Sequence, residues 1–253
     1  MIDNLIHFGC SFAMGNGVPT YVNGLKSGAF VHTGDLRQEF MSRYKIEPKQ
    51  PKSCGSIIAK KLGLKFTKIA ENGASNEMIF RKILKTKLQN SFVLVGFTSN
   101  NRREGLTTSK RSSHWHTWKM IAPGEVAKYK DLIFSPWKNE YKPAIEAEGQ
   151  IRTLIQIIYM QNYFKSNNTP YLMFNALWNG FDLPLTKECD ELLSKVDEKF
   201  FYKLRGTSQE TQHGWCVERK LNVSDIDDHP NLEGQEAWAN ELLPHVKEIL
   251  NAD

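Results

Sequence analysis

The chain has 253 residues, of which 40% are hydrophobic, and it carries a formal net charge of +5 at pH 7. This length allows one α/β domain with a sizeable core. The charge is too small for the length to indicate nucleic-acid binding by itself. No run reaches the about 18 apolar residues that indicate a membrane-spanning helix, so we expect no membrane partner.

Cysteine spacing and the N-terminus bear on cofactors and location. The four cysteines, Cys10, Cys54, Cys189 and Cys216, have none of the spacings typical of metal sites, and we expect reduced thiols. The N-terminus lacks the basic head and apolar stretch of a signal peptide. We therefore predict a soluble, cytoplasmic protein that needs no cofactor and no metal.

The first predicted element is a buried strand over residues 5–8 that ends in small residues and a hydroxyl. Gly9 permits a sharp exit from this strand. The turn would place Ser11 at the carboxyl edge of a sheet, where a nucleophilic serine is accessible to a substrate. The same residues are also compatible with a simple strand-to-loop turn that buries its serine.

The first half of the chain continues the pattern of strands and helices. Residues 14–52 are rich in Gly, Pro and charge and predict an irregular excursion with one helix near 36–44. Ser53 is a good N-cap and Gly63 a good stop for a helix over 53–62. A strand over 65–70, an amphipathic helix over 77–88 and a buried strand over 92–95 follow.

The second half repeats this alternation. We predict a helix over 151–164, a strand over 171–174, and helices over 186–202 and 234–250. Alternating strands and helices predict a three-layer α/β sandwich, in which helices cover both faces of a mostly parallel sheet. Ligands of such sheets bind at the carboxyl ends of the strands. Five polar residues should share that edge: Ser11, Asn76, Thr98, Asn175 and His229.

An acidic cluster followed by a histidine lies near the C-terminus, at Asp225, Asp227, Asp228 and His229. A serine hydroxyl becomes nucleophilic when an imidazole takes its proton, and a carboxylate fixes the tautomer of that imidazole. The cluster thus supplies the partners that Ser11 would need. His213 is a weaker candidate for the base, because no predicted helix follows it.

Four short islands of the chain resemble the sequence blocks of the SGNH or GDSL hydrolases, in the same order. They are Gly9-Cys10-Ser11-Phe12, Asn72-Gly73-Ala74-Ser75-Asn76, Gly96-Phe97-Thr98-Ser99 and Asp227-Asp228-His229-Pro230-Asn231. The resemblance implies a flavodoxin-like three-layer fold, with Ser11 as nucleophile and His229 as general base. The acid would be Asp227 or, alternatively, Asp225, since the usual position is Ile226.

The resemblance also implies an oxyanion hole and a reaction. The backbone N–H groups of Ser11 and Asn76 would bind the oxyanion, with Thr98 in place of the family's Asn. The reaction would be ester hydrolysis through an acyl-enzyme, with a carbohydrate O-acetyl group as the expected substrate class. Cys10, Asn76, Thr98 and Ile226 all depart from the family pattern. These departures favour the alternative, a non-catalytic binding or structural protein that keeps the fold.

The islands are also similar to SGNH-like proteins encoded by bacteriophages, which leaves a virion-associated role open.

We treat residues 1–253 as one domain with a lid-like insertion at about 101–150. Arg102 and Arg103 could hold an anionic group of the substrate, although an ion pair with Glu104 is an equal alternative. The partner we expect is a small-molecule or glycan ester.

Aromatic residues in this insertion alternate with cations, and Trp115 and Trp118 are the ones we assign to substrate binding. They could form a hydrophobic lid, stack on a sugar, or stack on nucleic-acid bases. We do not expect nucleic acid. His114 and His116 lack a third ligand nearby, which favours ordinary loop residues over a metal site.

Overall fold

The structure is a computed structural model that describes residues 1–15, 21–22, 25–26, 52–71, 73–108, 116–121, 143–223 and 228–252. The helix expected near 36–44 lies outside these residues. A five-stranded parallel sheet forms the centre, in the order β4-β1-β5-β8-β9. Its strands are β1 (Asn4–Gly9), β4 (Lys65–Ala70), β5 (Ser91–Phe97), β8 (Tyr171–Asn175) and β9 (Phe201–Tyr202).

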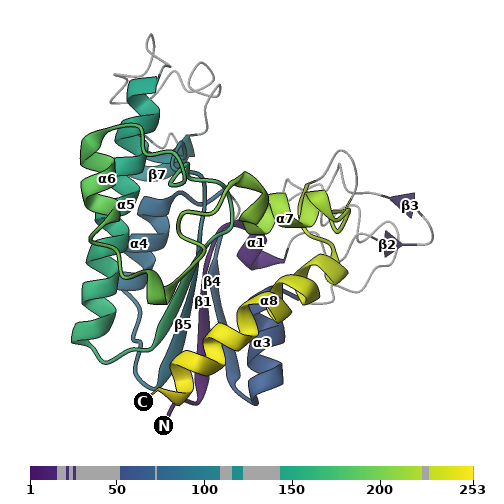
Figure 1. The fold of residues 1–253 in the computed structure, drawn as a ribbon. Coiled ribbons are helices and arrows are strands. Elements are labelled where there is room, and N and C mark those ends of the chain that lie inside the picture. The colour runs from purple at the N-terminus through teal and green to yellow at the C-terminus, as the bar shows by residue number, and fades with distance from the viewer. Residues whose placement is uncertain are drawn as a thin grey trace.

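Helices cover both faces of the sheet (Figure 1). One face carries α3 (Cys54–Leu62) and α8 (Leu232–Asn251), and the other carries α4 (Asn76–Leu84), α5 (Pro143–Ser166) and α6 (Lys187–Leu193). This arrangement confirms the predicted three-layer α/β fold. No helix in the described part of the chain is long and apolar enough to cross a membrane.

The remaining elements are short. They are α1 (Ser11–Met14), α7 (Gln212–Glu218), the 3-10 helices η4 (Glu198–Phe200) and η5 (Ser208–Glu210), and the antiparallel pairs β2 (Tyr21–Val22) with β3 (Leu25–Lys26) and β6 (Arg103–Thr108) with β7 (His116–Ile121). After the last strand, η5 and α7 lead to α8, and α7 lies near the carboxyl edge of the sheet (Figure 1), whereas η4 comes directly before β9.

Local signals explain the best-predicted elements. Every residue of β5 is buried, as expected of a central strand covered on both faces. The Ser53 side chain accepts a hydrogen bond from the Ser56 N–H, and Gly63 ends α3 with a φ of 69°, a conformation that favours glycine. The core lies between the sheet and its helices, with Phe8, Phe92 and Trp238 among its largest fully buried side chains.

Three helix predictions were wrong in their bounds. The helix expected over 77–88 ends at Leu84. The helix expected over 151–164 begins at Pro143, because proline fits the first helical turn, where its missing N–H has no partner to lose. The helix expected over 186–202 ends at Leu193. Asp197 then caps η4, and the chain enters the edge strand β9, whose two residues are both buried against the sheet.

Candidate active site

Ser11 lies just beyond the carboxyl end of β1, as the first residue of the four-residue helix α1. A Cβ on Gly9 would lie 2.6 Å from the Ala13 Cβ, so the turn that presents Ser11 requires glycine. Gly15 ends the helix in the left-handed conformation. The Lys68 ammonium donates a hydrogen bond to the Met14 carbonyl, which places a cation at the negative end of α1.

His229 meets Ser11 from the other end of the chain. The distance between His229 Nε2 and Ser11 Oγ is 2.8 Å. The backbone around His229 is fixed, because the Val223 N–H donates to the His229 carbonyl and Asn231 caps α8. The Phe12 ring lies against the imidazole, with centroids 5.0 Å apart and an interplanar angle of 31°. The two segments thus bring a hydroxyl and an imidazole into hydrogen-bonding contact.

The carboxylates predicted to orient His229, Asp227 and Asp225, lie outside the described residues. Asp228 lies inside them, but its carboxylate is 3.4 Å from Nε2 of His213. The Phe12 ring contacts His213 edge-on, at 5.9 Å between centroids, so Phe12 lies between two imidazoles. Sequence reasoning ranked His213 low, and only the fold supplies Asp228 as its partner.

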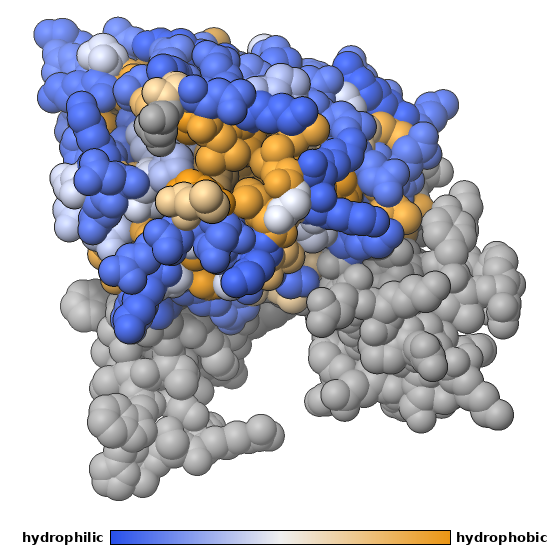
Figure 2. Space-filling model, turned by 90° about the horizontal axis from the view of Figure 1, so that it is seen from below, coloured by the Kyte–Doolittle hydropathy of each residue, from blue (hydrophilic) through white to orange (hydrophobic). Residues whose placement is uncertain are grey.

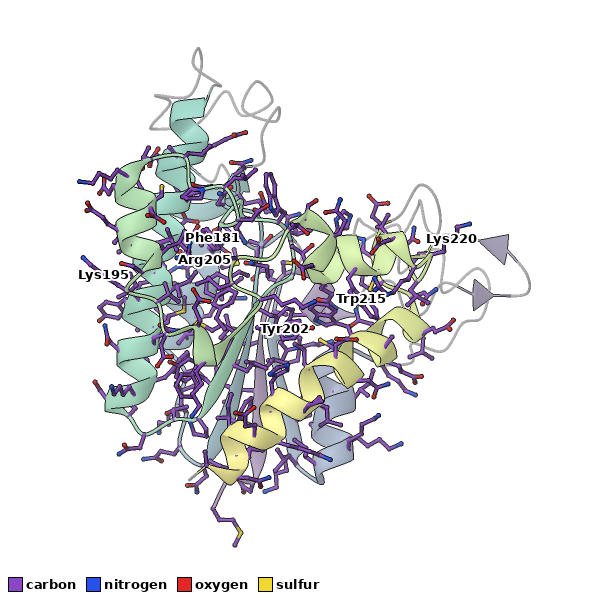
Figure 3. All side chains as sticks on the ribbon, viewed as in Figure 1. Phe181, Lys195, Tyr202, Arg205, Trp215 and Lys220 are labelled. Atoms are coloured by element: carbon purple, nitrogen blue, oxygen red, sulfur yellow. The ribbon has the colours of Figure 1, made fainter. Side chains whose placement is uncertain are left out.

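The helix that carries His213 is held against α8 by aromatic packing. Trp215 of α7 and Trp238 of α8 have ring centroids 5.7 Å apart, and Figure 3 shows Trp215 in the space between the two helices. The His213 N–H donates to the Ala176 carbonyl, which follows β8. The second imidazole is therefore anchored to the sheet as well as to α8.

Asn76 is the first residue of α4, so its backbone N–H belongs to the turn that has no partners within the helix. Its side chain forms two hydrogen bonds with the Thr98 backbone. Oδ1 accepts from the Thr98 N–H at 2.9 Å, and Nδ2 donates to the Thr98 carbonyl at 3.0 Å. The Nδ2 also donates to the Thr153 hydroxyl. The side chain of Asn76 thus fixes the backbone that follows β5.

The hydroxyl of Thr98 is buried and has no hydrogen-bond partner among the described residues. Arg102 is half-buried in the turn after β5, where its N–H donates to the Ser99 carbonyl. The other residues assigned to substrate binding are less defined. Arg103 and Trp118 belong to β6 and β7, whose side chains are not described, and Trp115 lies outside the described residues. Substrate contacts by these residues stay predictions.

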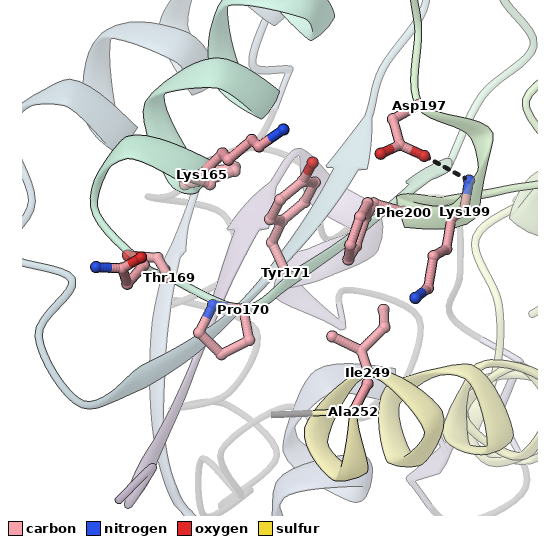
Figure 4. Close-up of a pocket in the computed structure, with 11 residues that line it drawn as sticks. Lys165, Thr169, Pro170, Tyr171, Asp197, Lys199, Phe200, Ile249 and Ala252 are labelled. Carbon is pink, nitrogen blue, oxygen red and sulfur yellow. Dashed lines mark hydrogen bonds between the residues drawn. The ribbon is translucent and has the colours of Figure 1, made fainter.

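A pocket of about 380 Å³ lies at the opposite end of the molecule. It is lined by the end of α5, the start of β8, η4 and the end of α8, and Figure 4 shows Tyr171 and Phe200 among the residues around it. Figure 2 views the molecule from below and shows hydrophobic residues gathered at the centre of that view. Since Tyr171 starts β8 and Ser11 follows the end of the parallel strand β1, this pocket is separate from the Ser11–His229 pair.

No family model matches the chain, and no curated protein matches it. Solved structures do resemble it. They include a carbohydrate esterase whose active site displays divergent catalytic and non-catalytic binding functions (13% identity, 97% of this chain, TM-score 0.46) and the lipase Lip_vut3 from a goat rumen metagenome (12% identity, 96% of this chain and 97% of that chain, TM-score 0.44). A third, described as a GDSL-like lipase, is from Parabacteroides merdae (12% identity, 97% and 95%, TM-score 0.43).

The chain spans 65% of the length of the carbohydrate esterase. At these identities the neighbours do not decide which reaction this chain performs. The activity therefore has to be argued from the residues of the site.

Proposed function

We propose that this protein hydrolyses an ester, with Ser11 as the nucleophile and His229 as the general base. The observation that carries the proposal is the contact of 2.8 Å between Ser11 Oγ and His229 Nε2. This distance lies within the range expected for a nucleophile and its base. The position of Ser11 at the carboxyl edge of a parallel sheet adds support, because ligands of such sheets bind there.

The first chemical step forms a bond between Ser11 Oγ and the carbonyl carbon of the ester. As this bond forms, the Oγ proton passes to His229 Nε2, and the carbonyl oxygen takes up the negative charge. Collapse of the tetrahedral intermediate breaks the bond to the alcohol oxygen, which receives the proton from His229. A water molecule then attacks the acyl-enzyme by the same sequence and releases the acid and free Ser11.

The negative charge of the intermediate needs hydrogen-bond donors that are in place beforehand. Ser11 and Asn76 are the first residues of α1 and α4, and first-turn N–H groups have no acceptor within their own helix. We assign the oxyanion to these two N–H groups, with Thr98 next to them. Asp227, or alternatively Asp225, would accept from His229 Nδ1 and stabilise the imidazolium.

The substrate class is a finer proposal that rests on the resemblance to SGNH hydrolases. It is an O-acetyl ester of a carbohydrate, bound with the help of Arg102, Arg103, Trp115 and Trp118. An esterase for acetyl groups should prefer acetyl over longer acyl chains, so a series of aryl esters of increasing chain length tests this part separately from the nucleophile.

The test of the function is the hydrolysis of a short-chain aryl acetate by the wild-type protein and by Ser11→Ala. We expect turnover that saturates with substrate in the wild type and falls to the buffer rate in Ser11→Ala. Equal rates for the two proteins and the buffer would refute the proposal. The alternative would then be a binding or virion-associated structural protein on a hydrolase fold.

A further inference from the structure

A buried amide lies behind the Ser11–His229 pair. Gln235 belongs to the second turn of α8, six residues after His229, and its side chain is fully buried. Its Nε2 donates to the Phe12 carbonyl at 3.2 Å. Its Oε1 accepts from the Cys54 N–H at 2.8 Å and from Gln212 Nε2 at 3.3 Å. One side chain therefore contacts three other elements, α1, α3 and α7.

These three contacts join the ends of helices. Phe12 lies in α1, directly after Ser11, while Cys54 and Gln212 are the first residues of α3 and α7. Helix ends carry backbone groups that have no partner within the helix, and in a buried location each needs one from elsewhere. Gln235 supplies the partner for one such group, the Cys54 N–H, and contacts a second buried amide, Gln212. It also gives the Phe12 carbonyl a second donor beside the Gly15 N–H.

The amide also links the two halves of the proposed catalytic pair. The Gln235 N–H donates to the carbonyl of Asn231, the N-cap of α8, so its position relative to the His229 segment is set by the first turn of that helix. Its Nε2 holds the residue after Ser11. Gln235 thus forms a short connection between the Ser11 and His229 segments, although the two residues come from opposite ends of the chain.

We propose that Gln235 is a positioning residue, which sets the distance and angle between Ser11 Oγ and His229 Nε2 by holding the Phe12 carbonyl. This inference rests on the proposed esterase function. A displacement of about 1 Å within a reacting pair can lower the rate about a hundredfold. Loss of the contact should therefore lower kcat and leave KM nearly unchanged, because Gln235 is buried behind the pair.

The chain offers a matched control in Gln161. This residue is also buried, and its amide also bridges two elements, with Nε2 donating to the Asp197 carbonyl and Oε1 accepting from the Asp197 N–H, both at 2.9 Å. Asp197 lines the pocket at the other end of the molecule. Gln235→Met and Gln161→Met thus each remove a buried amide that bridges two elements. Only the amide of Gln235 contacts the Ser11 segment.

The experiment measures kcat and KM for an aryl acetate in wild type, Gln235→Met and Gln161→Met, with active serines counted by a phosphonate probe. We expect kcat per folded molecule to fall about tenfold to a hundredfold in Gln235→Met and to stay within about twofold in Gln161→Met. Equal kcat values in the two variants, at comparable loss of melting temperature, would overturn the inference.

Gln235→Glu adds a readout that a purely structural role would not move. A protonated carboxyl can donate to the Phe12 carbonyl as the amide does, whereas an ionised one cannot. The activity of Gln235→Glu relative to wild type, taken at each pH, should therefore rise as the pH falls. A ratio that does not change with pH would overturn the inference, and so would failure of both Gln235 variants to fold. A wild-type protein without hydrolysis or probe labelling would instead refute the proposed function.

Discussion

Asn76→Ala tests the local structure that fixes the carboxyl edge of the sheet. The Asn76 side chain makes paired hydrogen bonds to both backbone groups of Thr98, at 2.9 and 3.0 Å, and both residues are buried. Alanine would leave the Thr98 N–H and carbonyl without partners and without access to bulk water. Each such buried group costs about 1–3 kcal/mol, so we expect the free energy of unfolding to fall by about 4 kcal/mol.

Urea denaturation followed by circular dichroism measures this difference. Asn240→Ala is a suitable control, because Asn240 is exposed on α8 and accepts a hydrogen bond from Lys61 at the surface. We expect that control to stay within about 0.5 kcal/mol of wild type. A loss below about 1 kcal/mol in Asn76→Ala would mean that Thr98 finds other partners, and the account of this edge would be wrong.

Three further predictions concern buried groups near β1 and α3. Burial, with a smaller contribution from Lys68, lowers the pKa of His7 from 6.5 to about 3. The unfolded chain therefore binds a proton that the folded chain does not. Relative to pH 7.5, the free energy of unfolding at pH 5 should fall by about 2 kcal/mol, and urea titrations of His7→Leu should lack this part of the slope. Gly55→Ala should cost about 1–3 kcal/mol despite better helix propensity, because its Cβ would lie 2.5 Å from His7 Nδ1; a melting temperature equal to wild type would contradict the close packing. Burial raises the pKa of both Cys54 and Cys216 to about 12, so iodoacetamide at pH 8 should alkylate these thiols only after unfolding, and rapid mass-detected alkylation of the native protein would contradict their burial.

The parts of the fold that the sequence predicted well depend on local chemistry. The apolar run of β5 and the Ser53 and Gly63 caps of α3 are signals that a few neighbouring residues carry by themselves. Local signals of this kind predicted the strands and helices one by one. Their alternation along the chain then predicted a parallel sheet. The rule that the carboxyl ends of parallel strands share one edge places Ser11 there. The contact of Ser11 with His229, which lies in the turn before α8, was predicted from the pairing of a serine with an acid–histidine cluster.

The parts that sequence reasoning missed depend on contacts between distant segments. Asp228 as the partner of His213 becomes visible only when the turn before α8 lies against α7. Gln235 looks like any polar residue of an amphipathic helix, and its burial results from three helix ends that converge on it. The side chain of Asn76 was likewise overlooked, because the resemblance to SGNH hydrolases drew attention to its backbone N–H. No pattern within a short window could have predicted these roles.

The most direct test of the central claim is the rate at which a serine-directed phosphonate labels the protein, with the modified residue located by mass spectrometry. We predict that wild-type protein is labelled at Ser11 alone, and that labelling slows by at least about a hundredfold in His229→Ala, since the hydroxyl loses its base. Labelling of the wild type at no serine, or at the same rate in His229→Ala, would contradict the claim that Ser11 and His229 act as a nucleophile and its base.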